Sequence, residues 1–176
     1  MEFFICNNSS EIRIRFISYF VMPYNLCKKR YNERFKDKRY EYTFKKYRED
    51  FMWCRFPDDA IEMCFEHAID FLSKKSSNVF FMSEDVGNGS MNYCEFEQGN
   101  NNRGRVASVN AKDLAYTIKH EWKLKSTEET YFQQEYILPD DLYVFDDSFL
   151  WCIVFTHENY IDSVSDSRIC FYIYEN

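Results

Sequence analysis

The chain has 176 residues, a formal net charge of −7, 45% hydrophobic residues and 20% aromatic residues. A chain of this length fits one domain and buries about two thirds of the surface that its unfolded form exposes, so a disulfide framework is not needed. We therefore expect a single domain over residues 1–176. The high aromatic content favours a thick core or, more weakly, a covered interface.

The charge is unevenly distributed along the chain. Residues 1–56 hold 13 Lys and Arg against 7 Asp and Glu, a balance of +6, whereas residues 57–176 hold 9 against 22, a balance of −13. A solvated acidic surface is the commoner explanation of such a pattern. The alternative is an acidic face suited to a basic partner.

The cysteines and the absence of targeting signals indicate the compartment. The seven cysteines form no CxxC pair and have no nearby His at zinc-finger spacing, so we expect buried free thiols in a reducing cytoplasm. The apolar stretch at residues 16–22 is too short for a signal or transmembrane segment. We expect a cytoplasmic protein with no membrane association, no metal and no cofactor.

The first 55 residues predict a hairpin followed by a helix. Residues 2–6 form a short apolar strand candidate, and residues 11–20 begin with an alternation typical of a second strand. From residue 25 to residue 55 the period changes, and rings at positions 40, 44, 47 and 51 fall on one face of an amphipathic helix.

This helical segment also has features of a nucleic-acid surface. Ten of the 22 basic residues lie between Lys28 and Arg48, interleaved with aromatic residues. The overall acidity argues against this function, so nucleic acid is an unlikely partner.

The next segments predict two helices and two strands. A helix over residues 57–73 would start at Pro57 and bury a stripe including Ile61, Cys64, Ala68 and Leu72. His67 lies off that stripe, and we expect a solvated or hydrogen-bonded histidine there rather than a ligand. A strand at 78–83 follows. Residues 86–110 contain all four glycines and predict a long loop or a pair of short strands. A helix over 111–124, with residues 114, 115, 118 and 122 inward, and a strand at 131–138 come next.

The C-terminal part predicts the centre of the sheet. Residues 149–155 are an unbroken apolar run, typical of a strand buried on both faces, and residues 142–145 would pair with it in a hairpin. Asp146 to Ser148 have turn chemistry, which would place Phe149 opposite Asp146. With a last strand at 168–174, the order of elements predicts an α+β domain: a mainly antiparallel sheet with helices packed on one face.

No catalytic motif emerges from the sequence. His157 beside carboxylates would be a common proton-transfer arrangement. In the expected hairpin, however, His157 lies about 26 Å from Asp146, at about 3.3 Å per residue. A site that combines His157 with Glu158 and Glu135 remains possible, so a small acid-base enzyme is the alternative to a non-catalytic protein.

The stretch LYVFDDSFLWCIVFTHE, residues 142–158, resembles the closing hairpin of family 4275 of domains of unknown function. The segment FMWCRF, residues 51–56, is similar to that family's aromatic segment with Trp, and a helix and a strand follow it in the same order. The resemblance implies a bacterial cytosolic protein, and it implies no reaction. Small acidic α+β proteins of this kind also resemble immunity proteins that neutralise toxins.

These observations favour a protein-binding module over an enzyme. We expect an immunity-like or antitoxin-like protein that occludes a basic toxin domain, with electrostatic complementarity speeding encounter and aromatic anchors holding the complex. The expected partner-binding residues lie in and beside the irregular segment. They are Glu84, Asp85, Tyr93, Glu95, Phe96 and Glu97.

Overall fold

The structure is a computed structural model that describes residues 1–23, 52, 55–56, 61–83, 94–98, 104–125, 136–139, 141–155 and 171–175. Within these residues, seven strands form one sheet in the order β1-β4-β3-β5-β6-β7-β2, and every pair of neighbouring strands is antiparallel. The predicted α+β class is confirmed. In chain order the elements are β1 (Phe4–Ile5), α1 (Ser9–Phe20), β2 (Ile61–Met63), α4 (Phe65–Ser73), β3 (Asn78–Ser83), α5 (Glu95–Gln98), β4 (Val106–Asn110), α6 (Ala111–Lys125), β5 (Leu142–Phe145), β6 (Trp151–Phe155) and β7 (Phe171–Glu175).

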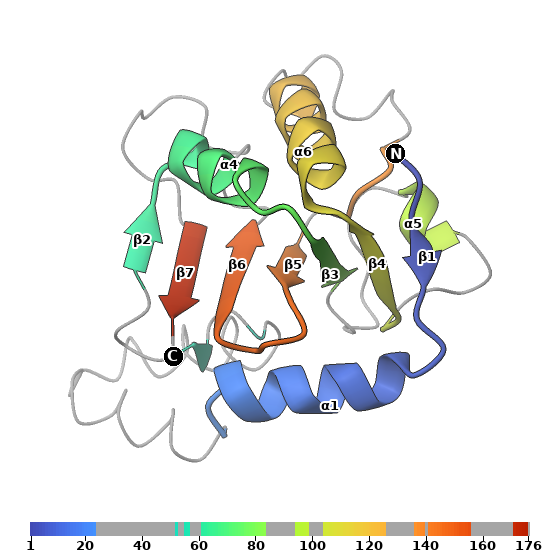
Figure 1. The fold of residues 1–176 in the computed structure, drawn as a ribbon, viewed down its shortest axis with the longest axis vertical. Helices are drawn as coiled ribbons and strands as arrows, with labels where there is room; N and C mark the ends of the chain where they lie inside the picture. The colour runs from blue at the N-terminus through green and yellow to red at the C-terminus, as the bar shows by residue number, and fades with distance from the viewer. Residues whose placement is uncertain are drawn as a thin grey trace, which may run out of the picture.

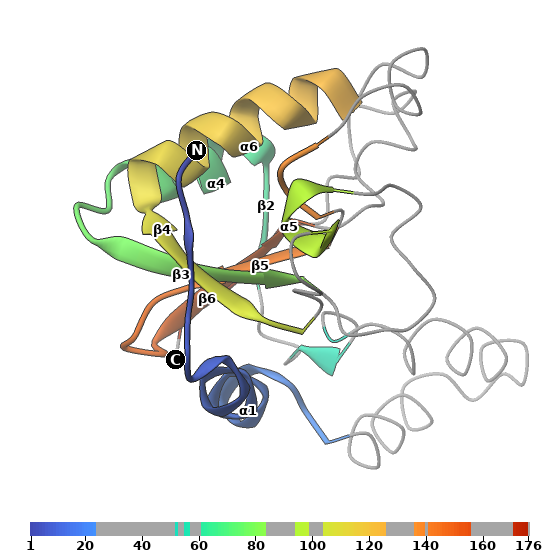
Figure 2. The same cartoon turned by 90° about the vertical axis from the view of Figure 1, so that its right-hand side faces the viewer.

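The described elements form three layers. Helices α4 and α6 lie side by side on one face of the sheet, and α1 crosses the opposite face, as Figures 1 and 2 show from two directions. Two apolar clusters match these layers, one between the sheet and α4 with α6, the other between the sheet and α1. The expectation that helices cover only one face is therefore wrong.

Helix α1 replaces the strand predicted at residues 11–20. Ile12, Phe16 and Phe20 are buried at a spacing of four residues, whereas Ile14 is 67% exposed. Ile12, Phe16 and Phe20 lie on one face at a period of two and also, at a spacing of four, at a period of 3.6, so the sequence pattern is ambiguous. The helix is selected by tertiary packing, because the Phe16 ring lies 4.7 Å from the ring of Phe145 on β5.

The predicted hairpin of residues 142–155 is present with a different register. The expected turn at 147–148 is present, because the backbone N–H of Phe149 donates to the carbonyl of Asp146 at 3.2 Å. The ladder does not continue from this pair: Phe145 pairs with Cys152, so β6 begins at Trp151. All five residues of β6 are buried, which confirms a strand covered on both faces. The centre of the sheet is its neighbour β5, with three strands on each side.

The helix predicted at 57–73 begins only at Phe65. Residues 61–63 instead form β2, an edge strand whose Ile61 pairs with Ile173 of β7. A partner more than 100 residues away in the sequence leaves no local signal, and Pro57 therefore misled the prediction. Ala68 and Leu72 are buried as expected, whereas Cys64 is exposed.

The irregular segment contains a strand that completes the sheet. Strand β4 pairs with β3 on one side and with β1 on the other, and α6 follows it directly. The predicted strands at 78–83 and 142–145 and the helix at 111–124 are confirmed to within one residue. The first strand along the chain, β1, lies within the predicted range 2–6, and the last, β7, lies at 171–175, where a strand was predicted at 168–174.

The described end of the strand predicted at 131–138, residues 136–138, is not part of a β-ladder. In the described residues 136–138, the strand pairing is an isolated parallel bridge between Tyr136 and Cys94. The backbone N–H groups of Ile137 and Leu138 donate to the Glu121 carboxylate instead of to a strand. Most of the helix predicted at 25–55 lies outside the described residues, which include only Met52 and Arg55 of that range.

Candidate functional site

The expected partner-binding residues fall partly on α5. Glu95, Phe96 and Glu97 belong to this short helix, and Phe96 is part of the apolar cluster that also includes residues of α4 and α6. Glu95 is exposed. Glu84, Asp85 and Tyr93 lie outside the described residues.

Backbone contacts and a buried ring hold α5 in place. The backbone N–H of Glu95 donates to the carbonyl of Tyr136 at 2.6 Å, and that of Phe96 donates to the carbonyl of Ile137 at 3.1 Å. The Phe96 ring is fully buried, 4.9 Å from the ring of Phe81 and 5.8 Å from that of Phe3. Phe96 is therefore a core residue, and the expectation that it anchors a partner is wrong, because a partner cannot reach a ring with no exposed surface.

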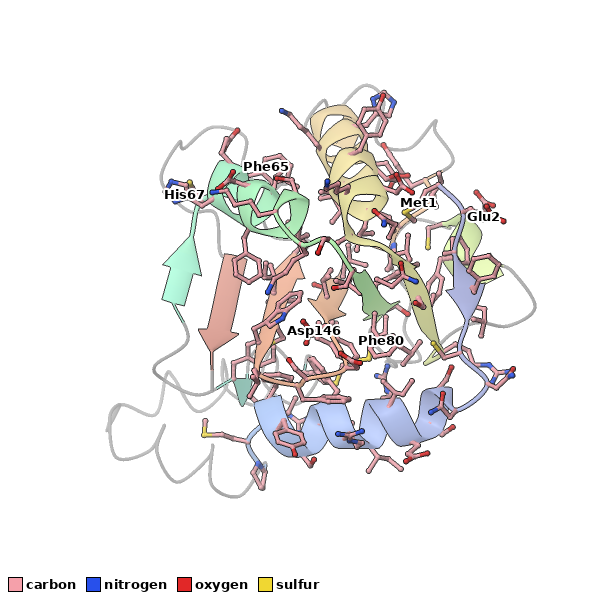
Figure 3. The ribbon with its side chains drawn as sticks, viewed as in Figure 1. Met1, Glu2, Phe65, His67, Phe80 and Asp146 are labelled. Atoms are coloured by element: carbon pink, nitrogen blue, oxygen red, sulfur yellow. The ribbon has the colours of Figure 1, made fainter. Side chains whose placement is uncertain are left out.

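The alternative enzyme site of Glu135, His157 and Glu158 lies outside the described residues, as does the basic segment Lys28 to Arg48. His67 is exposed on α4, as predicted, and its side chain lies at the outer side of the helix (Figure 3). Within the described residues no three His, Cys, Asp or Glu side chains gather as metal ligands would.

The turn between β5 and β6 holds a network of polar contacts around Asp146. One carboxylate oxygen accepts from the backbone N–H of Ser148 at 3.1 Å and from its hydroxyl, which confirms the turn chemistry expected for Asp146. The other oxygen accepts from the indole Nε1 of Trp151 at 2.5 Å. Asp147 is exposed at the tip of this turn. Asp146 thereby fixes both the turn and the first side chain of β6.

Side chains of α1 pack on the same turn. The Tyr19 ring stacks on the Phe149 ring with 5.5 Å between centroids and 24° between planes, and the Arg15 guanidinium lies 4.3 Å from the centre of the Phe149 ring. Phe149 is 1% exposed under this cover, whereas Tyr19 is 47% exposed and the next residue, Leu150, is 57% exposed. We call the exposed residues Arg15, Tyr19, Asp147 and Leu150 the turn surface; Arg15 and Tyr19 cover the buried Phe149 ring.

Phe149 has a backbone conformation that is unusual for its residue type. Its φ is 54°, and it is the only residue other than glycine with positive φ among those described. In this region the Cβ of an L-residue crowds the following carbonyl oxygen, at a cost of about 1–2 kcal/mol. The rings and the guanidinium around Phe149 stabilise this conformation.

Sequence reasoning missed the turn surface. Its two parts are about 130 residues apart in the chain, and residues 11–20 were expected to be a strand. A helical reading would have placed Arg15 and Tyr19 on one face, since residues four apart are neighbours on a helix. Nothing in the sequence says which turn lies against that face.

The fold and these contacts define a three-layer α+β protein with two surfaces that expose ordered polar and aromatic groups. No family model matches the chain, and no curated protein or solved structure shows a significant similarity to it. The resemblance to family 4275 therefore stays a prediction. In the described part of the chain, no helix has the length and apolar character needed to cross a membrane.

Proposed function

We propose that this protein is a non-catalytic, cytoplasmic protein-binding module whose partner has a basic surface. The observation that carries the proposal is the presentation of Glu95. Its carboxylate is exposed, while the next residue, Phe96, is buried and the backbone of both is hydrogen-bonded to residues 136–137. An acidic group on a held backbone loses little conformational freedom when it binds.

The charge distribution supports a basic partner. Residues 57–176 carry a balance of −13, and α5 lies within that range. A field of this sign attracts a basic surface over distances of about one Debye length and raises the association rate more than the affinity. The most specific form of the proposal is an immunity-type protein that occludes a basic toxin domain.

The cysteines fit the proposed compartment. Cys6, Cys64, Cys94 and Cys152 are free thiols. Cys94 and Cys152 are buried, Cys6 is half-buried and Cys64 is exposed. Free thiols are typical of proteins from reducing compartments, where disulfides are rare.

The experiment starts from co-purification of the tagged chain with whatever it binds in its native host. Association of the purified pair is then measured by biolayer interferometry at several salt concentrations, with Glu95→Lys/Glu97→Lys compared with Glu66→Lys/Asp113→Lys. Glu66 and Asp113 are exposed on α4 and α6, and the control changes the net charge by the same amount.

The expected result is an association rate about tenfold lower for the α5 variant at low salt, with a smaller effect for the control. Equal effects of the two variants would mean that only the net charge matters and that α5 is not the contact surface. Failure to obtain any stoichiometric partner would remove the proposed function.

A further inference from the structure

The turn surface exposes two large side chains to solvent. Tyr19 and Leu150 retain about half of their surface in contact with solvent. Tyr and Arg are the residue types enriched at the energetic centres of protein interfaces, and a tyrosine gives a large contact area with only two torsions to order. The composition is therefore that of a binding surface.

This surface is also held rigid. Stacking on Phe149 fixes the Tyr19 ring, the Arg15 guanidinium covers the same ring, and the Asp146 contacts fix the backbone of the turn. Phe149, which has the strained φ of 54°, belongs to this turn. Such strained positions cluster at functional sites, where the surrounding structure maintains them.

The charges select the kind of partner. The exposed carboxylate of the turn is that of Asp147, because the Asp146 carboxylate accepts from Ser148 and Trp151. The face of the Arg15 guanidinium is occupied by the Phe149 ring. Asp147 makes no ion pair with any described residue and is exposed. A Lys or Arg of a partner can therefore approach Asp147, while apolar groups of the partner cover Tyr19 and Leu150.

We propose that the turn surface is the anchoring site of the basic protein partner, with Tyr19 and Leu150 as its apolar anchors and Asp147 as its charged contact. This inference rests on the proposed function. It adds a second surface, on the α1 side of the sheet, that is built from different residues than α5. The two surfaces can be tested separately.

The experiment uses the full tagged chain as bait in lysate of its native host and compares four forms. These are the wild type, Tyr19→Ala/Leu150→Ser, Asp147→Lys and the matched control Tyr116→Ala/Phe4→Ser. Tyr116 and Phe4 are 77% and 66% exposed, on α6 and β1, so the control removes similar side chains from elsewhere on the surface. Urea unfolding of each form shows that the variants fold.

The inference predicts that a protein retained by the wild type and by the control binds the Tyr19→Ala/Leu150→Ser variant at least about tenfold more weakly, and that Asp147→Lys lowers its association rate. A partner that is lost only with Glu95→Lys/Glu97→Lys would overturn the turn surface and leave the proposed function standing. Absence of any partner would overturn both. Self-association of the wild type in sedimentation, lost in the turn variants, would mean that a second copy occupies the surface, which contradicts the inference as stated.

Discussion

The carboxylate of Glu121, on α6, accepts a hydrogen bond from the backbone N–H of Leu138 at 3.1 Å, and its other oxygen accepts from the N–H of Ile137 at 2.7 Å. Glu121 is only 5% exposed. The segment it holds provides the carbonyl groups that bind the backbone of α5. One buried carboxylate thus connects α6, the chain at 136–138 and the helix that presents Glu95.

Removing this carboxylate should destabilise the protein strongly. Glu121→Ala leaves two backbone donors without their acceptor, and we expect a loss of about 2–4 kcal/mol in the free energy of unfolding. Glu121→Gln keeps one carbonyl oxygen and should lose about half as much. Urea denaturation followed by circular dichroism measures both, with the exposed Glu66→Gln as a control. A Glu121→Ala variant as stable as the control would contradict this role.

The inner and outer faces of α1 should respond very differently to truncation. Phe16 is fully buried against the rings of Phe20, Tyr143 and Phe145, so Phe16→Ala should cost about 3–5 kcal/mol. Ile14 is two residues away and 67% exposed, so Ile14→Ala should change stability by about 0.5 kcal/mol or less. Thermal unfolding of the two variants checks the helix directly. In a strand, Ile14 and Phe16 would lie on the same face of the sheet. Similar losses of stability for the two variants would therefore contradict the packing of α1.

The strain at Phe149 predicts an unusual order of stability. Phe149→Ala and Phe149→Gly both remove the ring, but only glycine adopts a φ of 54° without a steric penalty. We expect the Gly variant to be about 1 kcal/mol more stable than the Ala variant, the reverse of the order in a helix. Urea midpoints of the two proteins give the difference. If Ala were the more stable, the turn would not require positive φ at this position.

The thiols should differ in reactivity. Burial raises the pKa of the Cys6 thiol, so less of it is thiolate at a given pH, and Cys64 is exposed at the start of α4. With iodoacetamide at pH 8, we expect Cys64 to be alkylated first, Cys6 more slowly, and the buried Cys94 and Cys152 only on unfolding.

Peptide mass spectrometry resolves each site, and the fully unfolded protein serves as the control in which the four rates converge. Raising the pH should increase the rate at Cys6, because its thiolate fraction then rises. Equal rates at Cys64 and Cys94 in the native protein would contradict the described burial.

Much of the architecture follows from local sequence patterns. The structure of several elements is determined by a few neighbouring residues. These elements are β6 with its apolar run, the short apolar strand β3, α6 with its stripe of Leu114, Ala115 and Ile118, and the Asp146 turn. Short-range periodicity reports burial directly, because a strand alternates its faces every residue and a helix repeats every 3.6. The α+β class could be predicted for this reason.

Tertiary structure decided the remaining features. Residues 9–20 form a helix because Phe16 packs on the Phe145 ring of β5. Strand β2 forms because it pairs with β7. Phe96 is buried because its ring packs against those of Phe3 and Phe81. The turn surface exists because α1 crosses the sheet at the β5–β6 turn. The composition and charge of the sequence determined that the protein has acidic and aromatic side chains for its surfaces. Only the packing of segments far apart in the chain determined which side chains stand together on them, because the free energy of such contacts depends on neighbours that no local pattern identifies.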